Sequence, residues 1–145
     1  MVRILKLLSL VGMIFFCASC GKPNPETSLP LQQFFETNIL NRNFIVSFAQ
    51  DSAVDITSEY NGYTFVLLKT DFYHGPLKAN YGASTYNGTW SCDSDYGQIT
   101  ITLPDTPSVF QFLTRSWRFV KKDIPTLQLA PWGTTQPYFL NMTRQ

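Results

Sequence analysis

Most of this chain is a series of short β-like runs separated by turn residues, and that division favours an all-β fold. The clearest run alternates Ile99, Ile101 and Leu103 with Thr100 and Thr102, so one side of that strand faces a core and the other faces water. The connections are short, which makes the strands antiparallel neighbours, because a parallel crossover needs about a dozen residues. The expected strands cover residues 44–49, 56–60, 63–69, 76–80, 86–92, 98–103, 116–121, 126–130 and 138–143, and residues 110–113 could form another short one.

The length of this β-rich segment indicates how the sheet is arranged. Residues 44–143 have room for about eight or nine strands of about six residues each, with turns of about four to six. A sheet of that size exposes two edges unless it closes on itself or splits into two layers. We therefore expect a small antiparallel up-and-down β-barrel of about eight strands, preceded by one α-helix that follows a signal peptide. A two-sheet sandwich is the alternative.

One helix is expected ahead of the strands. Leu31, Phe34, Phe35 and Ile39 lie at offsets 0, 3, 4 and 8, which places them on one face of a helix over residues 31–40. A free tether has no need of such a face, whereas a small barrel has an open apolar end. We therefore predict that this helix packs across one end of the barrel with Phe34 and Phe35 buried. The competing interpretation is an exposed docking face for a partner.

The N-terminus has the order of features found in secretory signals. Arg3 and Lys6 precede an apolar run over residues 7–16, and a stretch of small residues follows. Ala18, Ser19 and Cys20 resemble a bacterial lipobox, in which the signal is cut before a cysteine that receives lipid. The predicted organisation is a lipoprotein signal peptide at 1–19, a lipidated Cys20 with its tether at 20–30, and a barrel domain at 31–145. Ordinary cleavage and an uncleaved anchor are the alternatives.

Charge and motif content bear on several functional classes. The chain has 11 basic and 10 acidic residues and no basic cluster, so nucleic acid is not an expected partner. His74 is the single histidine, and no serine nucleophile motif accompanies it. Cys92 falls on an expected strand, while Asp93 and Asp95 fit a hairpin turn better than a calcium loop. We expect no catalytic residues, no metal and no cofactor.

Several short motifs, taken in order, resemble a known group of proteins. They are Asp55-Ile56-Thr57, Tyr60-Asn61-Gly62-Tyr63-Thr64-Phe65, Asn87-Gly88-Thr89-Trp90, Leu113-Thr114-Arg115-Ser116-Trp117, Leu127-Gln128-Leu129 and Phe139-Leu140. Their order and spacing over about residues 43–143 resemble the lipocalin-like, calycin-type lipoproteins of Bacteroidota. The resemblance implies a lipocalin-like barrel and raises the alternative that a small hydrophobic ligand is carried inside it.

Two aromatic residues near the C-terminus are the candidate binding residues. Trp132 lies in a proline-bounded loop, where an exposed indole could stack on a sugar or a partner surface, and Tyr138 follows the same loop. A tryptophan folded over the end of the barrel is the alternative for Trp132. We expect bulky inward residues to fill most of the barrel, so a glycan or an envelope protein would meet its outer surface.

The expected location follows from the N-terminal motif. Lipid on Cys20 would anchor the chain in a membrane, and stable anchoring takes two or more acyl chains. Gly21 follows the cysteine in place of the aspartate that marks inner-membrane retention in enterobacterial lipoproteins, so the outer membrane is favoured. The barrel would face either the periplasm or the cell surface.

The lipobox interpretation predicts the behaviour of one variant. Cys20→Ser should accumulate as an unprocessed precursor and should not incorporate labelled fatty acid, because the acceptor thiol is gone. Metabolic palmitate labelling and the mobility of the chain on a gel measure both effects. Normal labelling of the variant would contradict the lipobox.

Overall fold

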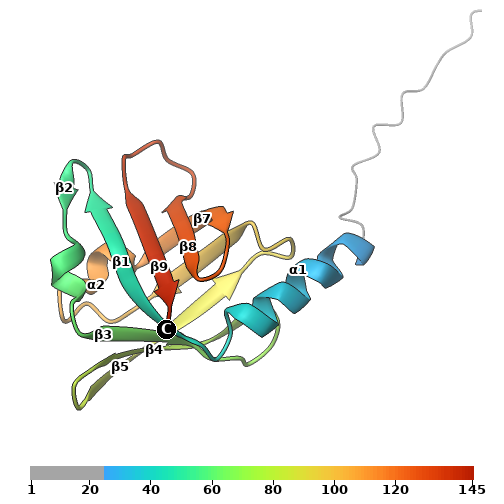
Figure 1. The fold of residues 1–145 in the computed structure, drawn as a ribbon, viewed down its shortest axis with the longest axis horizontal. Coiled ribbons are helices and arrows are strands. Elements are labelled where there is room, and N and C mark those ends of the chain that lie inside the picture. Colours follow the sequence, from blue (N-terminus) through green and yellow to red (C-terminus); the bar gives the residue numbers. More distant parts are fainter. Residues whose placement is uncertain (1–24) are drawn as a thin grey trace, which may run out of the picture.

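The computed structural model describes residues 25–145, with side chains from Pro30 onward, and its strands curl around a common core (Figure 1). The predicted signal peptide and Cys20 lie outside the described residues. The strands are β1 (Asn43–Asp51), β2 (Val54–Asp55), β3 (Tyr63–Leu67), β4 (His74–Tyr81), β5 (Ser84–Cys92), β6 (Gln98–Thr102), β7 (Arg115–Lys122), β8 (Thr126–Pro131) and β9 (Phe139–Arg144). The helical elements are α1 (Pro25–Asn38), the 3-10 turn η1 (Thr57–Tyr60) and α2 (Phe110–Leu113). Within residues 25–145, no helix is long and apolar enough to span a bilayer.

Pairing between the first and last strands closes the sheet. From β3 onward each strand pairs antiparallel with the next one in the chain. β1 pairs with β3 at only two positions, but with β9 from Phe44 opposite Arg144 to Gln50 opposite Phe139. The two-residue β2 pairs only with the last two residues of β1. The fold is therefore a closed antiparallel barrel of eight strands, as the sequence predicted, and the sandwich alternative is wrong.

Two segments differ from the expected strands. Residues 56–60, expected as a strand, contain the 3-10 turn η1 instead. The side chain of Asp55 accepts the N–H of Thr57 at 2.8 Å, and the Thr57 hydroxyl accepts the N–H of Ala49 at 2.9 Å. These two hydrogen bonds hold the segment after β2 as a turn beside β1, so no strand forms there. Residues 110–113 form the helical turn α2, because this conformation buries Phe110, Phe112 and Leu113 together.

The N-terminal helix begins earlier than expected and meets the barrel differently. It starts at Pro25, inside the segment assigned to the tether, and Pro30 lies within it. Prolines usually mark a helix boundary, which is why the sequence placed the start after Pro30. Only the C-terminal end of α1 meets the barrel, and the rest extends away from it (Figure 1). Phe35 is buried as predicted, but Phe34 is only half-buried, so that part of the prediction is wrong.

Large apolar side chains fill the barrel, and no polar or charged residue is buried in the described chain. At one end, the ring of Phe35 lies 5.0 Å from Tyr96 and 5.6 Å from Trp90, between ring centroids. At the other end, the Tyr60 hydroxyl donates to the carbonyl of Val109 at 2.8 Å, which ties η1 to the segment before α2. The side chains with under 2% exposure are Trp90, Trp117, Tyr96, Phe35, Phe44, Phe65, Phe110, Ile39, Leu40, Leu77, Leu113 and Leu140.

The alternation along β7 predicts very different costs for two neighbouring substitutions. Trp117 is fully buried and its indole N–H donates to the carbonyl of Leu113 at 3.0 Å, whereas Arg118 is exposed. Trp117→Ala should lower the free energy of unfolding by about 3 to 5 kcal/mol. Arg118→Ala should lower it by about 0.5 kcal/mol or less. Urea denaturation measures both, and equal midpoints would contradict the inward register of Trp117.

Candidate functional site

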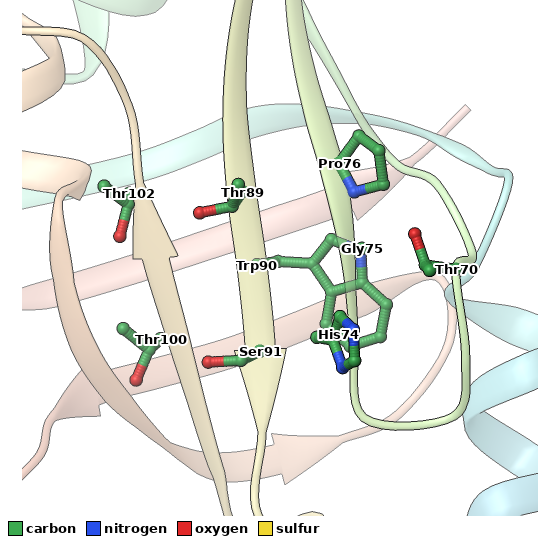
Figure 2. Close-up of a pocket in the computed structure, with 9 residues that line it drawn as sticks. All are labelled: Thr70, His74, Gly75, Pro76, Thr89, Trp90, Ser91, Thr100 and Thr102. Carbon is green, nitrogen blue, oxygen red and sulfur yellow. The ribbon is translucent and has the colours of Figure 1, made fainter.

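A hollow of about 340 Å³ lies on the outer face of the barrel, over β4, β5 and β6 (Figure 2). Along these strands, buried residues such as Gly75 and Trp90 alternate with exposed ones. The exposed set, which points away from the core, supplies most of the lining. The lining residues are Thr70, His74, Gly75, Pro76, Thr89, Trp90, Ser91, Thr100 and Thr102.

Strand register arranges the polar lining in two rows. Thr89 lies opposite Thr102, and Ser91 lies opposite Thr100. Strand neighbours are about 4.8 Å apart and alternate residues along a strand about 6.7 Å apart, so the four hydroxyls form a grid of that spacing. Figure 2 shows these side chains on the two adjacent strands, with His74 beside them on β4. The grid is a surface of uncharged groups that can each donate and accept a hydrogen bond.

A glycine allows the wall of the hollow to form. A Cβ at Gly75 would overlap the carbonyl oxygen of Leu68, so only glycine permits this close approach of the β3–β4 connection. The same carbonyl accepts the indole N–H of Trp90 at 2.7 Å. Trp90 is only 1% exposed, so it forms the floor of the hollow and does not present a ring for stacking.

Asp71 holds His74 at the edge of the hollow. One carboxylate oxygen of Asp71 accepts the backbone N–H groups of Tyr73 and His74, at 2.8 and 2.9 Å. The other oxygen lies 2.9 Å from Nδ1 of His74. The N–H of Tyr73 lowers the pKa of Asp71 most, and the backbone and side chain of His74 act in the same direction. With Nδ1 engaged by the carboxylate, Nε2 is the imidazole nitrogen left for a ligand.

These groups suit recognition of a polar ligand by hydrogen bonding. His74 and Ser91 are cross-strand neighbours, but no hydrogen bond joins their side chains in the described residues. The described part of the chain also contains no group of three or more side chains that could hold a metal ion.

The two predicted binding residues, Trp132 and Tyr138, have different contacts in the structure. Trp132 is 48% exposed, and its backbone N–H donates to the carbonyl of Ser116 at 2.9 Å. The Ser116 hydroxyl is 2.7 Å from that of Thr100, so Trp132 lies at the far end of a cross-strand row that begins in the hollow. Tyr138 is half-buried and its ring packs against Arg115 and Phe112. Cys20 lies outside the described residues.

The other residues considered for chemistry, Cys92, Asp93 and Asp95, lie at the end of β5 and in the turn that follows it. Cys92 ends β5 as a half-buried free thiol, with Sγ 3.7 Å from the carbonyl oxygen of Phe72. Asp93 and Asp95 form the turn between β5 and β6, where they accept the N–H groups of Gln98 and Gly97 at 2.9 and 3.2 Å. The predicted hairpin turn is therefore confirmed.

Sequence reasoning missed the hollow itself. From the sequence, His74 has no expected role, whereas in the structure it is the first residue of β4 and is fixed by Asp71. The available signal was the hydroxyl residues on the outward side of two successive strands, at Thr89 and Ser91 and at Thr100 and Thr102. Without the register, nothing showed that these pairs face each other.

Comparison with known proteins supports the fold. No family model matches the chain, and no curated protein matches it. Among solved structures, the chain is similar to the crystal structure of a DUF4847 family protein from Bacteroides vulgatus ATCC 8482, determined at 1.00 Å resolution. The TM-score is 0.53 at 18% sequence identity, over 74% of this chain and 95% of that one. At 18% identity this likeness shows the barrel fold alone.

The environment of Cys92 predicts its reactivity. Burial raises the pKa of this thiol from 9.0 to about 12, and the charges of Asp93 and Asp71 act in the same direction. Only the thiolate reacts, so at pH 8 we expect alkylation by iodoacetamide to be at least about a hundredfold slower than in the same chain unfolded in urea. Mass spectrometry of the peptide containing Cys92 gives both rates. Equal rates would show that the thiol is open to solvent.

Proposed function

We propose that this chain is a lipid-anchored protein of the cell envelope whose barrel is a non-enzymatic binding module that works through its outer surface. The charged, apolar and small-residue order before Cys20 supports the anchor, and Gly21 favours the outer membrane. Its partners would be the membrane, through the N-terminal lipid, and a ligand or envelope protein at the barrel surface.

The observation that carries this proposal is the filled interior. Trp90, Trp117 and Phe65 are each at most 1% exposed, and Phe35 closes one end against Trp90 and Tyr96. A carrier of the lipocalin kind needs an apolar space along its axis, which a barrel of eight strands can provide only when its inward side chains are small. Bulky side chains at these positions favour recognition from outside.

The chemistry of the hollow favours a neutral, hydroxyl-bearing ligand such as a glycan. Five hydroxyls and one imidazole can exchange hydrogen bonds with sugar hydroxyls, and no unpaired charged side chain lines the hollow. The exposed indole of Trp132, reached along the row through Thr100 and Ser116, offers a surface for stacking beyond the hollow. Aromatic faces and hydroxyl groups together are suited to sugars.

Backbone amide NMR of the full chain tests the ligand class. We would add cellohexaose, maltohexaose, chitohexaose or a polysaccharide extract of a Gram-negative envelope and follow Thr89, Ser91, Thr100 and Thr102. Saturable shifts at these residues are expected. Thr89→Val, which removes one hydroxyl at constant shape, should weaken binding about fivefold. Thr85→Val, on the same strand outside the hollow, is the matched control and should bind normally.

The same preparation tests the alternative that the barrel carries a small hydrophobic ligand. A fluorescent fatty acid, dansyl-undecanoic acid, should show no saturable change in emission, because the barrel is filled. Saturable micromolar binding, with amide shifts at inward residues such as Leu77 and Leu140, would contradict the proposal and support a carrier.

A further inference from the structure

Arg115 lies in an unusual environment at the end of the barrel opposite α1. It is the first residue of β7, and it has the same inward parity along the strand as buried Trp117. The carbon of its guanidinium is 4.4 Å from the ring centroid of Tyr138, 5.0 Å from that of Phe112 and 5.4 Å from that of Trp117. The cation is therefore surrounded by aromatic rings at the rim of the core.

The guanidinium has no anionic partner among the described residues. The three ion pairs of the described chain join other residues. Nε of Arg115 is the one side-chain nitrogen or oxygen there that is buried without a hydrogen-bond partner. Arg115 as a whole is half-buried, and neither terminal nitrogen of its guanidinium is among the buried atoms without a partner. A buried donor without a partner is rare in native structures.

We propose that Arg115 binds the carboxylate of a ligand with an apolar body, at the barrel end opposite α1. The rings of Tyr138, Phe112 and Trp117 lie around the guanidinium, and its two terminal nitrogens are the donors that would meet an anion. A planar guanidinium pairs with a carboxylate through two parallel N–H donors. The half-buried ring of Tyr138 supplies an apolar surface for the body of the ligand.

This site is independent of the proposed glycan surface. Arg115 is absent from the lining of the hollow over β4, β5 and β6, and its contacts come from α2, β7 and the segment before β9. In this site Tyr138, one of the two binding residues predicted from the sequence, acts by packing its ring on the Arg115 cation. A chain that binds no glycan could still bind a carboxylate here, and the reverse also holds.

The Nε–H resonance of Arg115 in the NMR spectrum of the full chain provides a direct test. Sodium benzoate should shift it saturably, whereas sodium chloride at the same ionic strength should not. Arg115→Lys keeps the charge but loses the planar donor pair, so benzoate binding, followed at the Tyr138 amide, should weaken at least about tenfold. Arg118→Lys, an exposed position on the same strand, is the matched control and should bind normally. Thr89→Val should also leave the response unchanged.

Three results would overturn the assignment. One is the absence of any saturable shift of the Arg115 resonance with benzoate. Another is an equal response at Arg118, which would indicate screening of surface charge. The third is a saturable response to inorganic phosphate without one to benzoate, which would replace the carboxylate with a different anion. If Arg115→Lys fails to fold, the comparison of the Arg115 and Arg118 resonances in the unmodified chain still decides.

Discussion

Pairing of β1 with β9 is the contact on which the rest of the structure depends. It joins the two ends of the β-segment over most of the length of both strands. Without it, β1 would keep only two paired positions with β3 and the short β2, and two long strand edges would face water. Closure also divides every strand into an inner and an outer side. The inner side packs the core, and the outer side is left for binding.

The inner side is occupied by large apolar groups, and this places recognition on the outside. Two tryptophans and several phenylalanines meet in a barrel of only eight strands, and aromatic contacts continue to both ends. Phe35 brings α1 into the same cluster, so the helix completes the core at one end. The groups left for recognition are then the hydroxyl-rich outer face of β4, β5 and β6, and the rim around Arg115.

Sequence reasoning succeeded where the information is local. The alternation of Ile99, Ile101 and Leu103 marked a half-buried strand, and Trp117 was placed inward correctly, because successive side chains point to opposite faces of any strand. It failed at residues 56–60, whose apolar and β-branched residues suit a strand but whose backbone is held as a turn by Asp55 and Thr57. It also failed at the start of α1, because Pro30 is tolerated inside that helix.

By itself, the sequence determined the class of fold, the inward residues of most strands and the face of α1 that meets the core, because these depend on the period of a strand or a helix. Only the tertiary structure decided which residues become neighbours. The hydroxyl grid exists because register places Thr89 opposite Thr102 and Ser91 opposite Thr100. Arg115 meets Tyr138 because the antiparallel register of β7, β8 and β9 brings the residue before β9 back beside the start of β7. Register and closure are set by the packing of the whole core, and no local pattern in the sequence records them.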